Sequence, residues 1–168
     1  YLAGETTFNM LTQVVGRAGR GDSPGKAIIQ TMVPDHQVIR YAAEQDYDGF
    51  YDLEIQLRRV QNAPPFGDLA AVVVTGREET AVLRGAAKFR DSLVACLRQE
   101  AYREERCAVL GPAPCAVPKV NYHFRYQLTL RCRLTRAMRQ LLSYLLREFG
   151  KDKANRGVSA YIDVNGFD

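Results

Sequence analysis

Residues 122–133 read YHFRYQLTLRCR, and in this stretch apolar and polar side chains alternate. A period of two is typical of a β-strand that is buried on one face and exposed on the other. The side chains expected to face a covering layer are Phe124, Tyr126, Leu128, Leu130 and Cys132. The opposite face, which a two-layer fold leaves open to solvent, carries His123, Arg125, Gln127, Thr129, Arg131 and Arg133. The stretch predicts one strand of a sheet with helices on one side.

The segments around this strand predict a regular order of elements. Residues 69–76 (LAAVVVTG) are typical of a buried strand, and apolar residues repeat at helical spacing over residues 78–102. We expect a short strand at 107–110, a proline-punctuated loop, the strand at 122–133, a helix at 134–149 and a last strand at 158–164. This order predicts an α/β (α+β) domain, a split β-α-β-β-α-β two-layer sandwich of ribosomal S10-like or ferredoxin-like type.

The N-terminal part follows a different pattern. Residues 26–33 (KAIIQTMV) predict a short strand. Residues 35–62 carry apolar side chains at helical spacing, with Asp35 as the expected N-cap. A second helix is expected to start near Asp46 and Asp48 after a break.

The APPFG segment at 63–67 is the best candidate boundary, because proline lacks a backbone N–H and restricts the residue before it. On this basis the chain divides into residues 1–34, a helical linker at 35–67 and the sandwich domain at 68–168. Its 168 residues suffice for one compact domain, or for a small domain plus part of another. The sequence begins with Tyr1 and not with methionine, from which we expect a fragment of a longer protein.

The composition is that of a soluble globular protein, with 46% apolar and 25% charged residues. No apolar run approaches the roughly 18 residues that a membrane-spanning helix needs, so no membrane partner is expected. The four cysteines, Cys96, Cys107, Cys115 and Cys132, show no C-x-x-C spacing. We therefore expect free thiols in a reducing cytoplasm and no metal site.

Basic residues are concentrated in one part of the chain. The sequence has 23 Lys and Arg against 19 Asp and Glu, yet residues 106–147 contain no acidic residue. Such asymmetry favours a surface for a polyanion or an acidic partner; the alternative is a solvated face balanced by acids that folding brings near. Arginines on the outward face of a predicted strand favour the binding surface. Its candidate residues are Lys119, Arg125, Arg131 and Arg133.

Residues 13–21 read QVVGRAGRG, which is too rich in glycine for a helix interior. Arg17 and Arg20 lie three residues apart on this frame and can project the same way. Guanidinium groups are permanently charged and pair with two phosphate oxygens at once, so the two could stabilise a transferred γ-phosphoryl group as arginine fingers do. A surface turn or a nonspecific RNA contact accounts for these residues equally well.

Residues 13–20 (QVVGRAGR) resemble motif VI, Q-x-x-G-R-x-G-R, of the superfamily 2 helicases. The wider pattern is similar to the C-terminal part of the PriA family, the bacterial replication-restart helicases also called primosomal protein N prime. From Glu5 onward it consists of ETTFNMLTQVVGRAGRG, PGKAIIQT, PDH, QDYDGFY, APPF, VLGPAP and RYQL. Two positions depart from the family: DVDP is replaced by DVNG at 163–166, and the tyrosine before Pro-Pro-Phe is Ala63.

The resemblance implies an ATP-dependent 3′ to 5′ DNA helicase that restarts stalled forks and loads the primosome, with residues 1–34 closing its second RecA-like lobe. Gln13, Gly16, Arg17 and Arg20 would contact ATP, and Arg17 and Arg20 would be catalytic, with Arg20 the first choice for the finger. The longer protein would use ATP and Mg²⁺ and would bind zinc through residues upstream of this chain. No G-x-x-x-x-G-K-[ST] phosphate loop and no Mg²⁺-binding motif occurs here, so the chain alone is expected not to hydrolyse ATP.

The resemblance also implies partners in the bacterial cytoplasm, near the nucleoid. The C-terminal domain would bind branched or forked DNA and dock the acidic tail of the single-strand-binding protein, alongside other primosome proteins. Arg136 and Gln140 are the candidates for the peptide, because an arginine beside a glutamine suits a terminal carboxylate; Arg139 and Arg147 lie on the polar side of the same predicted helix. A stand-alone peptide- or RNA-binding sandwich is the alternative, although the strand aromatics expected to face inward leave none for stacking on RNA.

Overall fold

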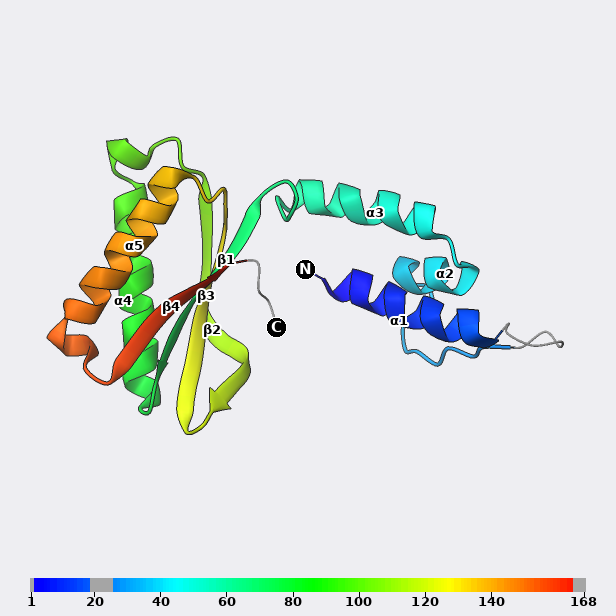
Figure 1. Ribbon diagram of the computed structural model, residues 1–168, viewed down its shortest axis with the longest axis horizontal. Helices are drawn as coiled ribbons and strands as arrows, with labels where there is room; N and C mark the ends of the chain where they lie inside the picture. Colours follow the sequence, from blue (N-terminus) through cyan, green and yellow to red (C-terminus); the bar gives the residue numbers. More distant parts are fainter. Residues whose placement is uncertain (1, 19–25, 165–168) are drawn as a thin grey trace. The chain divides into compact units, whose positions relative to one another are not determined.

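The computed structural model describes residues 2–18 and 26–164 of the chain (Figure 1). The chain divides into two compact units, Tyr1–Gln61 and Asn62–Asp168. In the described ranges, no helix has the length and the apolar character needed to cross a membrane. In the same ranges, no three histidine, cysteine, aspartate or glutamate side chains form a cluster that could hold a metal ion.

The described residues of the first unit form three helices, α1 (Ala3–Ala18), α2 (Gln37–Glu44) and α3 (Tyr47–Val60). Its small core contains Phe8, Val38, Ala42 and Phe50, and the rings of Phe8 and Phe50 stack with their centroids 4.2 Å apart. Arg58 of α3 joins two carboxylates: its Nη2 lies 2.8 Å from Glu5 and its Nε 2.9 Å from Glu54. The helices predicted over residues 35–62, with a break between them, are confirmed.

The two helix starts agree only in part with the sequence. α3 starts near Asp46 and Asp48, as predicted. Asp46 is its N-cap, since its Oδ1 accepts a hydrogen bond of 2.9 Å from a backbone N–H of the first turn. Asp35 does not cap α2, and this expectation is wrong. The N-cap is His36, whose Nδ1 accepts a hydrogen bond of 3.3 Å from the backbone N–H of Val38. The backbone N–H of His36 donates a hydrogen bond of 3.1 Å to the carbonyl of Val33 and closes a turn. The helix therefore begins one residue later than predicted.

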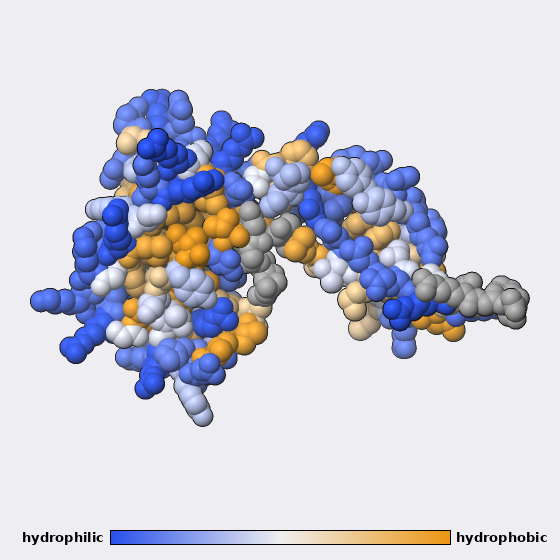
Figure 2. Space-filling model, in the orientation of Figure 1, coloured by the Kyte–Doolittle hydropathy of each residue, from blue (hydrophilic) through white to orange (hydrophobic). Residues whose placement is uncertain are grey.

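Two further expectations for the first unit are wrong. Residues 26–33 form no strand, and Ile28 and Met32 are 92% and 99% exposed. An apolar run becomes a strand only where another strand pairs with it, and the described part of this unit contains none. The expectation that residues 13–21 are too rich in glycine for a helix is wrong for residues 13–18. α1 continues through Gly16 to Ala18, because one glycine costs a helix only about 1 kcal/mol. Apolar side chains remain on the surface of this unit (Figure 2).

The second unit is a four-stranded antiparallel sheet with two helices on one face (Figure 1). In chain order it contains β1 (Asp68–Gly76), α4 (Glu79–Leu97), β2 (Cys107–Val120), β3 (His123–Cys132), α5 (Arg136–Lys151) and β4 (Val158–Val164). Short 3₁₀ turns lie at Glu100–Tyr102 and Lys153–Asn155. The strands are arranged in the order β2-β3-β1-β4. The predicted β-α-β-β-α-β sandwich is confirmed, although α4 ends at Leu97 and α5 begins at Arg136.

The predicted alternation of β3 is confirmed on its apolar side. Leu128, Leu130 and Cys132 are fully buried, and Phe124 and Tyr126 pack against the same core. The helices cover these residues with Val82, Ala86, Phe89, Leu93, Met138, Leu141, Leu142, Leu145 and Phe149. Gly85 lets the helices approach closely, because a Cβ there would lie only 3.2 Å from the ring of Phe149. Burial of this apolar surface is the main force that holds the two layers together.

The second strand, β2, is much longer than the strand expected at 107–110. Its pairing with β3 continues to Val120, with register shifts between Leu110 and Ala113 and between Pro114 and Lys119. β2 is an edge strand, where proline is tolerated because its missing N–H can face away from the ladder. The loop expected after residue 110 is therefore wrong, and the prolines lie in a bulged strand.

Leu128→Ala should destabilise the second unit by about 2–5 kcal/mol, because truncating a fully buried leucine loses apolar burial and leaves a cavity. Ser159→Ala, at an exposed position of β4, is the control and should change the free energy of unfolding by less than about 0.5 kcal/mol. Urea denaturation followed by the amide NMR signals of β1 and β3 measures both. A loss below about 1 kcal/mol for Leu128→Ala would contradict its place in the core.

Candidate functional site

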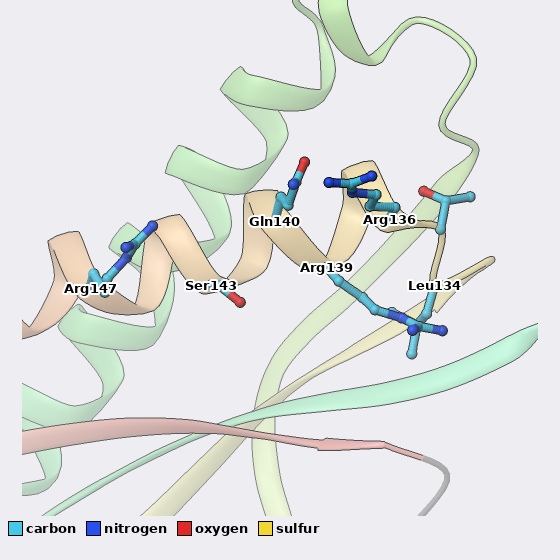
Figure 3. A pocket seen from close by; sticks show the side chains of 7 residues that line it. Leu134, Arg136, Arg139, Gln140, Ser143 and Arg147 are labelled. Atoms are coloured by element: carbon cyan, nitrogen blue, oxygen red, sulfur yellow. The ribbon is translucent and has the colours of Figure 1, made fainter.

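An open groove lies along the outer side of α5 (Figure 3). Its volume is about 680 Å³, and it is lined by Leu134, Thr135, Arg136, Arg139, Gln140, Ser143 and Arg147. Arg136 and Gln140 project on the same side of the helix, whereas Arg139 extends toward Leu134 (Figure 3). The structure therefore brings together the two residues selected from the sequence for peptide binding. It adds two further arginines to them.

The groove side chains form a row because the opposite side of α5 is buried. Met138, Leu141, Leu142, Leu145 and Phe149 pack into the core. Positions 136, 140, 143 and 147 are separated by four, three and four residues, which is the spacing of one helix face. Core packing alone thus directs the groove side chains outward.

Hydrogen bonds fix the start of α5. The hydroxyl of Thr135 accepts a bond of 3.1 Å from the first turn of the helix and donates one of 2.7 Å to Glu105 Oε1. The backbone N–H of Leu134 donates to Asp68 Oδ2 at 2.8 Å. A capped helix start presents the positive end of the helix dipole, and Arg136 is the first residue of the helix. The hydrogen bonds to Glu105 and Asp68 fix this end of the groove in position.

The groove is strongly cationic. Its lining contains three guanidinium groups and no carboxylate. Within residues 2–18 and 26–164, none of Arg136, Arg139 and Arg147 forms an ion pair. Unpaired arginines of this kind bind a carboxylate or a phosphate through two parallel hydrogen bonds. Arg139 and Arg147 are expected from the sequence only on the polar side of the helix, and their spacing from Arg136 and Gln140 is the signal that could have assigned them to the site.

The outward face of the sheet carries Arg125 and Arg131 of β3. Arg125 reaches across β1, and its Nη2 donates a hydrogen bond of 3.1 Å to the hydroxyl of Tyr161 in β4. This bond raises the pKa of Arg125 above its usual value. Tyr161 is 42% exposed and is an aromatic residue of this face that the sequence analysis misses. The period-two alternation of residues 158–164 (VSAYIDV) is the signal that locates it.

This face is not open to solvent throughout, so the expectation of a wholly exposed face is wrong. Ala71 and Val73 of β1 are 3% and 4% exposed and form a small buried cluster with Cys115 of β2. β2 bends partway along its length (Figure 1). Bulges at its prolines account for the bend, because an extra residue on one strand twists it away from its partner. Only part of the outward face is available to a ligand.

Lys119 lies on the other face of the sheet. It is the register partner of Phe124, and its Nζ stands 4.3 Å from the centroid of the Phe124 ring, at cation–π distance. Phe124 faces the helices, opposite to Arg125 and Arg131. Arg133 is exposed and follows the end of β3. The structure therefore does not gather the four candidate DNA-binding residues on one surface.

The motif VI residues lie at the end of α1. Gln13, Gly16 and Arg17 are helical and exposed, whereas Arg20 lies outside the described residues. Gln13 and Arg17 are four residues apart, which places them on the same side of the helix. The structure thus brings two of the four proposed ATP-binding residues onto one helix face.

Comparison with known proteins gives consistent matches. The profile of the family described as "Primosomal protein N C-terminal domain" matches residues 59–166. Three relatives carry the name "Replication restart protein PriA". The relative from Bacillus subtilis (strain 168) is 32% identical over 167 residues, which cover 99% of this chain and 20% of the relative. The relative from Synechocystis is 36% identical over 131 residues, 78% of this chain and 15% of the relative.

The relative from Chlamydia muridarum is 30% identical over 165 residues, which cover 98% of this chain and 21% of the relative. The chain thus spans about a fifth of the length of the curated relatives that it matches along nearly its whole length.

Proposed function

The chain belongs to the PriA family of replication restart proteins, and on that premise we propose that it is the C-terminal part of an ATP-dependent 3′ to 5′ DNA helicase. This helicase restarts stalled replication forks and loads the primosome. In this chain, the groove along α5 docks the acidic tail of the single-strand-binding protein. The observation that supports the docking site is that, among the described residues, three arginines and no carboxylate line the groove.

The terminal carboxylate of the tail fits the N-terminal end of the groove. Arg136 can hold a carboxylate through two hydrogen bonds, and the side-chain amide of Gln140 can donate to the same peptide. The two side chains project on the same side of the helix (Figure 3). The positive end of the helix dipole adds to the attraction.

The remaining arginines suit acidic residues that precede the terminus. Arg147 follows Arg136 by eleven residues, which is a distance of about 16 Å along a helix. An extended peptide covers this distance with about five residues. An acidic residue about five positions before the terminus would therefore reach Arg147.

The outward sheet face favours a second contact, with branched or forked DNA. Arg125 and Arg131 point away from the core, and Tyr161 beside Arg125 offers a ring for stacking on a base. Arg133 extends this basic surface, while Lys119 on the other face would contact DNA separately. Phosphate contacts of this type position a protein on DNA without reading its sequence.

Motif VI completes the ATP site of the longer protein. Arg17 and Arg20 reach the phosphates of ATP·Mg²⁺, with Arg20 as the finger, and Gln13 and Gly16 line the same site. Zinc is held by residues upstream of this chain. The longer protein works with other primosome proteins in the bacterial cytoplasm, near the nucleoid.

Arg136→Ala should weaken binding of an aspartate-rich peptide with a free C-terminal carboxylate by about tenfold or more, because a hydrogen bond to a charged group contributes about 1.5–3 kcal/mol. Arg156→Ala removes an exposed arginine outside the groove and should leave the Kd unchanged. Fluorescence anisotropy with the labelled peptide measures both. Amidating the peptide terminus should cause a similar loss that is not additive with Arg136→Ala. Equal binding to wild type and Arg136→Ala would remove Arg136 from the site.

The double variant Arg125→Ala and Arg131→Ala should bind forked DNA more weakly. The negative slope of log K against log salt should become smaller in magnitude by about two, one for each lost phosphate contact. Arg156→Ala is again the control. Binding isotherms at several salt concentrations measure the slope. An unchanged affinity and slope would exclude the sheet face, and no DNA binding at any salt would favour the alternative of a stand-alone peptide- or RNA-binding module.

Arg20→Ala in the longer protein should reduce ATP turnover by about a thousandfold or more, which is the usual contribution of an arginine finger. The chain alone should show no turnover, because it lacks a phosphate loop. A coupled ATPase assay with forked DNA measures the rate, and circular dichroism checks the fold. Full activity in Arg20→Ala would contradict the finger assignment.

A further inference from the structure

Two cysteines face each other across the β2–β3 pair. Cys107 is the first residue of β2, Cys132 is the last residue of β3, and the two are direct register partners. Opposite residues of an antiparallel pair share a face, with Cα atoms about 4.5–5.5 Å apart. Disulfides join Cα atoms that are about 4.4–6.8 Å apart. The backbone is therefore arranged for a bond between these two sulfurs without a change of register.

The two thiols differ in their access to solvent. Cys132 is fully buried, whereas Cys107 lies at the edge of the core and is only half-buried. Hydrogen bonding between the two thiols lowers the pKa of Cys132 and raises the pKa of Cys107, so access to solvent and not acidity favours Cys107 as the first thiol to react. The other cysteines are placed differently, Cys96 in α4 and Cys115 in the cluster on the outward sheet face. An oxidant from solvent would meet Cys107 first, with Cys132 directly behind it.

We propose that Cys107 and Cys132 form a redox-sensitive dithiol that a low-molecular-weight disulfide converts into a cross-strand disulfide. The Cys107 thiol, which solvent reaches, loses its proton and attacks one sulfur of the small disulfide. This step forms a mixed disulfide and releases the other half as a thiolate, which takes up the proton. The thiolate of Cys132 then attacks the Cys107 sulfur and releases the second half. The protein pair loses two electrons and two protons, and the small disulfide is reduced to two thiols.

The pair lies where the two strands support the start of α5. Glu105, two residues before Cys107, accepts the hydrogen bond from the Thr135 hydroxyl, and Leu134, two residues after Cys132, is held by Asp68. A disulfide would join covalently the two strand ends that position the N-cap of α5. Oxidation would thus restrict the end of the groove from which Arg136 projects. This link to peptide docking rests on the proposed function, whereas the dithiol itself does not.

Incubation of the chain with oxidised glutathione, followed by non-reducing peptide mapping with mass spectrometry, tests the proposal. We expect a peptide pair linked through Cys107 and Cys132, which is lighter than the two separate peptides by two hydrogen atoms. Reduction with dithiothreitol should regenerate the two separate peptides. Cys107→Ser should abolish the linked pair. The matched controls Cys96→Ser and Cys115→Ser should keep it.

A second variant separates chemistry from folding. Cys132→Ala adds no polar atom to the core, and circular dichroism shows whether it folds. In the folded variant, Cys107 should stop at the mixed disulfide with glutathione. A wild-type chain that also stops there, or that links only other cysteines or separate chains, would overturn the proposal. Because this experiment uses no docking peptide, a negative result is distinct from a failure of peptide docking.

Discussion

Burial of the apolar side of α5 against the sheet determines where the charged groups of the second unit point. Leu130 of β3 and Met138 and Leu141 of α5 are among its fully buried side chains. Each side chain of this size contributes roughly 1.5–3 kcal/mol when it leaves water. A surface ion pair contributes only about 0–1 kcal/mol, so the helix cannot rotate to pair its arginines without a net loss. The row of arginines in the groove is a consequence of core packing.

Among the described residues, the arginines are of two kinds: one is paired with carboxylates inside the fold, and others are exposed without such a pair. Arg58 of the first unit is mostly buried and contacts two carboxylates, Glu5 and Glu54, which fixes α3 to α1. Arg136 and Arg147 are exposed and form no ion pair within the described residues. Leaving them unpaired costs little stability and keeps their hydrogen-bond donors available. That contrast supports the binding role proposed for the groove.

Local sequence signals predict the order of elements. The apolar positions of β3 and α5 that these signals select are the positions that face the core in the structure. These predictions fail where the structure of a segment depends on a neighbouring element. Residues 26–33 meet no partner strand in the described part of their unit, and the prolines of β2 are tolerated only because the strand lies at an edge. The alternation of β3 does not predict the face on which Lys119 lies. A register shift precedes Lys119, and a turn with positive φ at Asn121 and Tyr122 follows it. At the site, resemblance selects Arg136 and Gln140. The helical spacing of Arg139 and Arg147 indicates that they lie nearby, but the groove that the four residues share is defined only by the folded surface.

The most direct test of the docking groove is an NMR titration of the isotope-labelled chain with the aspartate-rich peptide. The account predicts shifts of the amides of residues 134–147 and of the Nε–H signals of Arg136, Arg139 and Arg147, while the outward face of β3 stays unchanged. Shifts centred on Arg125 and Arg131, or no shift at a peptide concentration that saturates binding, would contradict it.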